Sequence, residues 1–199
     1  SKDLQFNSFL SSGFIFDKLI RSNFIQVMTA LIRREVLMKY GMPGPEFRRS
    51  DDWYLWLNLS YRGVKFCFID RVLVFQRRQR EGTLSDQKSY FKGTADTNIS
   101  IYRKFKEILS KEEAERYGLD NLLNFWQFRL ALGCVILGEK TEARETLAYF
   151  KIRSFRDFLK KVGLYLGIKI IPIYFLGKIV FALREYKRKR TFIEVRETT

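Results

Sequence analysis

Two adjacent carboxylates, Asp51 and Asp52, precede a segment that is apolar on nearly every side, WYLWLNLSY. A helix with so few polar positions has to be buried, because no side of it is suited to water. Ser50 is a typical N-cap residue, and the positive end of a helix dipole favours acidic side chains in the first turn. We therefore expect a buried helix that begins with two carboxylates. A carboxylate in such a position is a candidate general base, and capping of the helix alone is the other explanation.

The composition predicts a folded and strongly basic protein. Of its 199 residues, 46% are hydrophobic and 16% aromatic, which is enough for a sizeable core. The formal net charge of +15 calls for an anionic partner, and residues 151–199 hold 13 Lys/Arg against 4 Asp/Glu, a net +9. The absence of His excludes histidine triads, histidine metal sites and imidazole acid-base chemistry. We expect Cys67 and Cys134, each in an apolar run, to be buried free thiols.

Helices dominate the expected secondary structure. Residues 31–40 predict a helix that Gly41 ends, and the acidic pair opens the next one, which ends at Gly63. VKFCFID (64–70) and VLVFQ (72–76) predict two short strands, because β-branched and aromatic residues dominate them. Beyond residue 89 the pattern is helical, with amphipathic segments expected at residues 98–109, 119–138 and 140–152.

The last part of the chain predicts a basic amphipathic tail. One helical stripe is apolar and the opposite side is charged, with Phe155, Phe158, Leu159, Val162 and Leu166 on the first and Arg156, Asp157, Lys160 and Lys161 on the second. Pro172 breaks the path, and the apolar run from Val162 to Leu183 is interrupted by Lys169 and Lys178. We expect an interfacial hairpin or a docked helix pair that ends in a polybasic patch, in preference to a membrane span.

Residues 18–85 resemble the second half of the catalytic domain of family-2 glycosyltransferases, which have the GT-A fold. The family's order of elements is matched by NFIQVMTALIRREVLMKYG, SDDWYLWLNLSYRG, VKFCFID, VLVFQRR and GTLS, in that order. The resemblance implies a mostly helical α/β fold, the C-terminal, acceptor-side part of a GT-A domain followed by an α-helical extension. It implies three regions: residues 1–88 in the catalytic domain, 89–153 in the helical extension and 154–199 in the basic tail.

The resemblance also implies roles for individual residues. Asp52 falls on the general base that takes a proton from the acceptor hydroxyl, and Asp51 falls on its acidic neighbour, where the family more often has Glu. Arg77 and Arg78 fall in the basic loop that can hold the donor diphosphate, and a solvated loop is the alternative there. Gln79 stands where the family often has a metal-binding His, so the resemblance gives this chain no metal ligand.

The donor-binding half of such an enzyme has no counterpart in the chain. The family binds Mg²⁺ or Mn²⁺ through an Asp-x-Asp motif in a preceding strand-helix-strand half, and neither feature is present in the sequence. The metal is therefore expected in the full-length enzyme, on residues absent from this chain. We expect these 199 residues alone to be inactive.

The leading hypothesis is the acceptor side of an inverting glycosyltransferase. It would move a sugar from a nucleotide-sugar donor to a polysaccharide, glycolipid or other cell-envelope acceptor. The basic tail favours a cytoplasmic, peripheral location at the inner face of the plasma membrane, on anionic lipids. The alternative is a non-catalytic membrane-surface or scaffold module related to such transferases. Nucleic acid is not an expected partner, because the basic residues interleave with long apolar runs.

Overall fold

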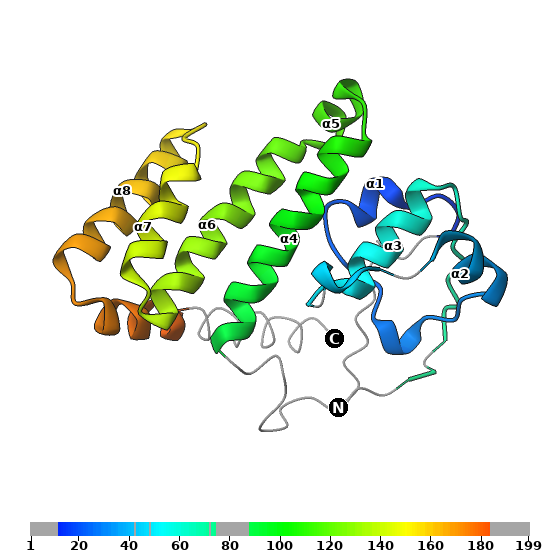
Figure 1. Ribbon diagram of the computed structural model, residues 1–199, viewed down its shortest axis with the longest axis horizontal. Coiled ribbons are helices and arrows are strands. Elements are labelled where there is room, and N and C mark those ends of the chain that lie inside the picture. Colours follow the sequence, from blue (N-terminus) through cyan, green and yellow to red (C-terminus); the bar gives the residue numbers. More distant parts are fainter. Residues whose placement is uncertain (1–11, 42, 48, 72, 75–87, 184–199) are drawn as a thin grey trace. The chain divides into compact units, whose positions relative to one another are not determined.

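The computed structural model describes residues 12–41, 43–47, 49–71, 73–74 and 88–183, and these form two compact units (Figure 1). Of the described residues, those up to residue 74 and Ser100–Leu122 form the N-terminal unit, and residues 88–99 and 123–183 form the C-terminal unit. Two long helices, α4 (Lys88–Ile108) and α6 (Leu119–Leu137), contribute to both units. The domain boundaries expected at residues 88 and 153 stay predictions.

The N-terminal unit is built around helix α3 (Asp51–Tyr61), which lies beside the short helix α1 (Phe16–Leu19) (Figure 1). Its other elements are η1 (Val27–Thr29), α2 (Arg34–Tyr40), η2 (Pro45–Phe47) and α5 (Lys111–Tyr117). Gly41 ends α2 with φ 75°, a left-handed conformation that glycine adopts without strain, so the expected end of this helix is confirmed. Residues 31–33 are not helical, so the helix starts at Arg34 and not at Leu31 as expected.

Burial of α3 is confirmed, and its aromatic side chains fix its neighbours. Trp53 and Trp56 are 3% and 2% exposed, so neither ring is a platform for a sugar. The indole nitrogen of Trp53 donates a hydrogen bond of 2.8 Å to the Leu19 carbonyl oxygen. The hydroxyl of Tyr102 donates one of 2.8 Å to the Ile20 carbonyl oxygen. Both side chains thus satisfy carbonyls at the end of α1, which its own turn leaves without helical partners.

The α/β fold implied by the resemblance is wrong for the part of the chain that the structure describes, where no strand forms. Residues 64–71 are not helical, and their only β pairing among the described residues is one isolated antiparallel bridge, Gly13 with Phe66. The Gly13 nitrogen donates to the Phe66 oxygen at 2.6 Å, and the reverse bond is 2.9 Å. A strand persists only when a neighbouring strand pairs with its backbone along its length. The described residues supply no such neighbour, so the β pattern of VKFCFID gives a single bridge.

The C-terminal unit is a set of packed helices, with α7 (Lys140–Tyr149) and α8 (Phe155–Ile170) in contact with each other (Figure 1). A further helix covers residues 173–183 after a break at Pro172. The expected break at Pro172 between two tail helices is therefore confirmed. The expected interfacial position stays a prediction, and the polybasic run after residue 183 lies outside the described residues. The shared core of the two tail helices with α6 and α7 consists of Ala131, Cys134, Val135, Ala143, Leu147, Phe150, Leu164, Ile168 and Leu176.

Glycine permits the helices of this unit to approach closely. A Cβ placed on Gly177 would lie 2.6 Å from the carbonyl oxygen of Val135, a distance that real Cβ atoms do not show. A Cβ on Gly133 would lie 2.8 Å from the Cα of Lys92. The helix over residues 173–183 therefore docks against α6 at backbone contact distance, and α4 does the same one turn away.

Within the described ranges, none of the helices combines the length and the apolar character needed to cross a membrane. Both cysteines are free thiols; Cys134 is buried as expected, whereas Cys67 is exposed, so its expected burial is wrong. Cys67 lies in the segment expected to be a strand, and without strand pairing its side chain has no core to enter.

Candidate functional site

The start of α3 holds the two predicted carboxylates in different surroundings. Asp51 is exposed and accepts a hydrogen bond of 3.0 Å from the Asp52 nitrogen. Asp52 is half-buried, and its Oδ1 accepts a bond of 2.7 Å from the Trp53 nitrogen. The Asn23 amide donates to the other oxygen, Oδ2, at 3.4 Å. Asp52 is therefore the more enclosed and the more firmly oriented of the two.

The carboxylates themselves satisfy the first-turn amides that Ser50 was expected to cap. Ser50 stands at the N-cap position with φ −149°, but its side chain makes no capping hydrogen bond. The predicted capping by Ser50 is therefore wrong, although the predicted helix start is confirmed. The bond between Trp53 and the Leu19 carbonyl ties the same turn to α1. The carboxylate of Asp52 therefore belongs to a helix turn that two hydrogen bonds hold to the preceding segment, from Trp53 to Leu19 and from Asn23 to Asp52.

Burial raises the pKa of Asp52 above its ordinary value of 3.8, and the neighbouring charge of Asp51 adds to the rise. The hydrogen bonds from the Trp53 nitrogen and the Asn23 amide lower the pKa, but they do not outweigh burial. A carboxylate whose main role is to cap a helix is stabilised in its charged form, so its pKa falls. The direction at Asp52 is the opposite, which means that its charge is unfavourable in the fold.

Asn23 is a neighbour of Asp52 that sequence reasoning missed. It is exposed, it precedes η1, and it also accepts a hydrogen bond of 3.3 Å from the Ile25 nitrogen through its side-chain oxygen. This second bond holds the amide so that its NH₂ group faces Asp52. An Asn in a segment of mixed composition gives no periodic signal, so only the fold brings the two residues together.

The remaining predicted residues do not join this site within the described structure. Arg77 and Arg78 lie outside the described residues. Arg33 and Arg34, the basic pair of the segment that resembles the family, are exposed at the start of α2. A shallow, open hollow lies along α2 and is lined by Arg34, Glu35, Met38 and Lys39; neither carboxylate lines it.

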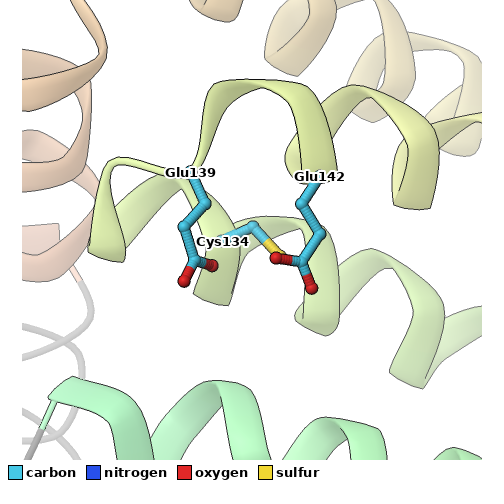
Figure 2. Close-up of side chains that lie close together, drawn as sticks. All are labelled: Cys134, Glu139 and Glu142. Carbon is cyan, nitrogen blue, oxygen red and sulfur yellow. The ribbon is translucent and has the colours of Figure 1, made fainter.

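A second group of acidic and thiol side chains lies in the C-terminal unit. Cys134 on α6 faces Glu139 and Glu142 at the start of α7, and one ligand-type atom from each lies within 4.8 Å of the others (Figure 2). The ammonium of Lys92 on α4 approaches Glu139 at 2.8 Å and Glu142 at 2.7 Å. A lysine ammonium therefore already pairs with both carboxylates that a metal ion would need.

The protonation of this group also argues for an ion pair. Burial alone would lower the pKa of Lys92, but the hydrogen bonds with Glu139 and Glu142 outweigh it and raise that pKa. Burial, together with the charge of Glu142, raises the pKa of the Cys134 thiol to about 11. At neutral pH the lysine is charged, and the raised pKa of the thiol makes the thiolate that a metal needs harder to form. The group joins α4, α6 and α7, and it gives no support for a metal.

The chain matches no protein-family model, no curated protein and no solved structure.

Proposed function

We propose that the chain is the acceptor side of an inverting glycosyltransferase related to family 2, in which Asp52 is the general base. The observation that carries the proposal is the half-buried Asp52 carboxylate, whose pKa is raised and whose orientation is set by Asn23. A fold gains no stability from a charge in such a place, and charges that are unfavourable for the fold concentrate at functional sites. The substrates would be a nucleotide-sugar donor and a glycan or lipid-linked acceptor of the cell envelope.

The chemistry assigned to Asp52 is the transfer of one proton. As the acceptor oxygen forms its bond to the anomeric carbon, its hydroxyl proton passes to the Asp52 carboxylate. The bond between that carbon and the donor diphosphate breaks on the opposite face, and its electron pair leaves with the diphosphate. A carboxylate suffices because the hydroxyl becomes acidic only as the new bond forms. Asp51, which is exposed, would contribute charge or contact the acceptor without taking the proton.

The donor and its metal are assigned outside this chain. Mg²⁺ or Mn²⁺ would bind the donor diphosphate through residues of a nucleotide-binding half, and the metal would stabilise the charge of the departing group. Arg77 and Arg78 are proposed as additional contacts to that diphosphate. The contribution of the chain is therefore acceptor binding and proton removal.

The test compares Asp52→Asn with Asp51→Asn in the protein that joins this chain to its donor-binding half. Release of nucleoside diphosphate is measured with a panel of UDP-, GDP- and dTDP-linked sugars. Loss of a general base lowers kcat by about 10² to 10⁴, so we expect a loss of this size for Asp52→Asn. Asp51→Asn should lower kcat by less than about tenfold, because Asp51 keeps no proton-transfer role in the proposal.

Asn is close to Asp in shape, and circular dichroism and unfolding curves of both variants verify that the fold is intact. Turnover of Asp52→Asn close to that of the parent protein would remove Asp52 from the base role. A loss of equal size in both variants would contradict the division of roles between the two carboxylates.

The alternative function is a non-catalytic membrane-surface module. The observation that favours it is the outward-facing apolar side of α8, where Phe155 is 74% and Ile170 is 73% exposed. A panel that yields no Asp52-dependent turnover, with vesicle binding intact, would favour this alternative. Under either function we propose a peripheral location at the inner face of the plasma membrane, on anionic lipid, which the positive charge of residues 151–199 supports.

A further inference from the structure

Helix α8 is apolar on two opposite sides, and only one of them is used by the fold. Its inner side carries Leu164 and Ile168, which are 8% and 0% exposed in the core of the C-terminal unit. Positions seven or eleven apart lie on one side of a helix, so Phe155, Leu159, Leu166 and Ile170 share the other side. These four side chains are 45% to 74% exposed. The stripe expected from the sequence therefore faces outward, and we call it the outer face of α8.

The following helix repeats the arrangement. Leu176 is 7% exposed and contacts Gly167 of α8, where a Cβ would lie 3.3 Å from a Leu176 methyl group. Phe175 and Ile179 are turned away from this contact and are 58% and 49% exposed. Both helices thus dock through one apolar side and leave another uncovered by any described residue.

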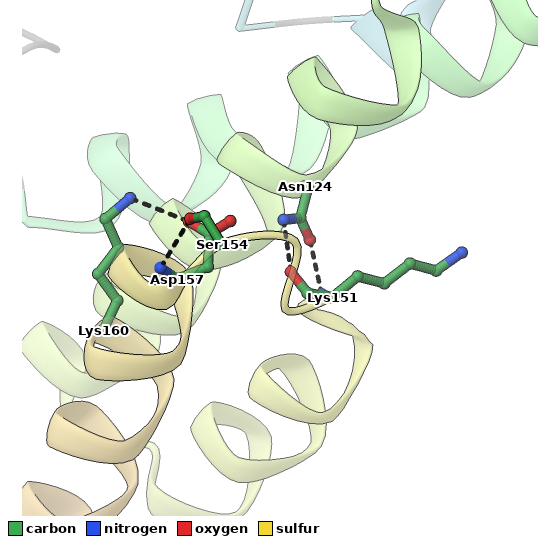
Figure 3. Close-up of polar contacts among 5 residues, drawn as sticks. All are labelled: Asn124, Lys151, Ser154, Asp157 and Lys160. Atoms are coloured by element: carbon green, nitrogen blue, oxygen red, sulfur yellow. Dashed lines mark hydrogen bonds and ion pairs between the residues drawn. The ribbon is translucent and has the colours of Figure 1, made fainter.

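The start of α8 is held rigidly, so its outer face is not an effect of loose packing. The amide of Asn124 on α6 donates to the Lys151 oxygen at 2.8 Å and accepts from the Lys151 nitrogen at 2.7 Å (Figure 3). Ser154 caps α8 by accepting from the Asp157 nitrogen at 3.1 Å (Figure 3). Asn124 is 6% exposed, and a buried side chain with paired bonds to one residue leaves the connection little freedom.

The charges beside the outer face are almost all positive. On α8, Arg156 and Lys169 border this face, whereas Lys161 is on the inner side and donates a hydrogen bond of 2.7 Å to the Phe150 oxygen. Lys178 lies on the next helix. The acidic residue of α8, Asp157, already pairs with Lys160 at 3.4 Å. The sequence continues as REYKRKR over residues 184–190, with five basic residues in seven. An apolar face bordered by lysine and arginine is complementary to a bilayer with anionic headgroups.

We infer that α8 is a membrane-surface helix that lies in the plane of an anionic bilayer with its outer face among the lipid chains. This inference rests on the membrane location proposed above and names α8 as the helix that contacts the lipid. The catalytic role of Asp52 does not depend on this inference. A second copy of the chain is a poorer occupant, because it would bring two faces bordered by positive charge together. The aromatic side chains of Phe155 on the outer face and Phe158 beside it suit the headgroup boundary.

The test is sedimentation of the full chain with vesicles of phosphatidylcholine alone or with about 30% phosphatidylglycerol, at about 150 mM NaCl. We expect binding to the anionic vesicles and at least tenfold weaker binding to the neutral ones. The triple variant Phe155→Gln, Leu159→Gln, Ile170→Gln should lose at least tenfold in affinity for anionic vesicles. Gln is a good helix former, so α8 should persist, which circular dichroism verifies.

The matched control changes three apolar residues of the N-terminal unit that are exposed as much or more: Leu31→Gln, Met38→Gln, Ile69→Gln. These side chains are 101%, 76% and 59% exposed, and their replacement should alter vesicle affinity by less than twofold. A second measurement uses Phe155→Trp and Leu31→Trp with brominated lipid. The emission added at position 155 should be quenched, whereas that added at position 31 should not.

Three results would overturn the inference. The first is that the full chain fails to sediment with anionic vesicles, and the second is that both triple variants lose vesicle affinity equally. The third is that the parent chain forms a dimer without lipid and that only the outer-face variant abolishes this dimer. Asp52→Asn should bind vesicles as the parent does, and the vesicle measurement needs no sugar donor. A negative vesicle result therefore leaves the proposed transfer reaction standing, and a negative turnover result leaves the membrane helix standing.

Discussion

At the scale of single residues, Asp52 is notable because its charge costs stability in the place where helix capping would reward it. Its hydrogen bonds with Trp53 and Asn23 favour the charged form, yet burial outweighs them and the pKa rises. The consequence has a definite sign. The folded state binds the Asp52 proton more tightly than the unfolded state does, so the ionised group destabilises the fold at neutral pH.

We therefore predict that Asp52→Asn makes the chain slightly more stable at pH 7. The gain should stay within about 1 kcal/mol, because solvent screens a half-exposed group. It should shrink as the pH falls through the raised pKa of Asp52 and vanish below the ordinary Asp pKa of 3.8, where the parent carboxyl is protonated in both states. Urea unfolding of both proteins between neutral and acidic pH measures the difference.

Asn23→Ala supplies a comparison of opposite sign. It removes a hydrogen bond that lowers the pKa of Asp52, so it should destabilise the chain more at pH 7 than in acid. A pronounced loss of stability in Asp52→Asn at pH 7 would contradict the assignment and restore helix capping as the role of this carboxylate.

The position of Asp52 could be predicted from the sequence, but its surroundings could not. Its place at a helix start follows from the local pattern of two acids before an apolar run. Asn23 is 29 residues away, and its contact with Asp52 depends on how α1 packs against α3. At Ser50 the local pattern was misleading. Serine is favoured as a capping residue, but the neighbouring carboxylates accept the hydrogen bonds that its hydroxyl was expected to accept.

At the scale of elements, helices were predictable and strands were not, for one physical reason. The hydrogen bonds of a helix are local, so the periodicity of the region after residue 88 predicts α6, α7 and the second half of α4, although it does not predict α5. A strand depends on a partner elsewhere in the chain, and residues 64–70 find one bridge, at Phe66. Their apolar side chains consequently remain partly exposed, with Phe68 at 40% and Ile69 at 59%.

The packing of the last helix yields a prediction at this scale. Gly177→Ala should destabilise the C-terminal unit by about 1–3 kcal/mol, because its Cβ would lie 2.6 Å from the Val135 oxygen and the helices would have to separate. Gly163→Ala on α8 is the matched control, since no atom lies within 4 Å of its added Cβ. That change should stabilise α8 by about 0.5–1 kcal/mol through helix propensity.

Urea unfolding curves, followed by circular dichroism, compare the two alanine variants with the parent chain. Opposite shifts of the midpoint are expected. Stabilisation by Gly177→Ala would mean that the helix over residues 173–183 does not rest on α6.

At the scale of the whole molecule, the net charge of +15 means that repulsion between positive charges opposes folding more than specific ion pairs favour it. Positive charges that are spread over the chain repel one another, which weakens the compact state, and salt screens this repulsion. A few pairs act in the opposite sense. Lys92 with Glu139 and Glu142 joins α4 to the start of α7, and salt weakens such partly exposed pairs.

Because the repulsive charge pairs outnumber the specific ion pairs, we predict that raising NaCl from about 20 to about 300 mM increases the free energy of unfolding by about 1 kcal/mol.

Lys92→Met keeps most of the apolar stem of the side chain but leaves Glu139 and Glu142 without their positive partner. It should lower stability at low salt by about 1 kcal/mol, a figure that allows for solvent screening of glutamates that are partly exposed. Salt should narrow this difference, since it screens the two carboxylates from each other. Urea unfolding at both salt concentrations measures the free energy of unfolding of the parent chain and of Lys92→Met. Sucrose serves as the control, because it stabilises proteins without screening charge. A parent chain that loses stability as NaCl rises would show that specific ion pairs, and not general repulsion, dominate its electrostatics.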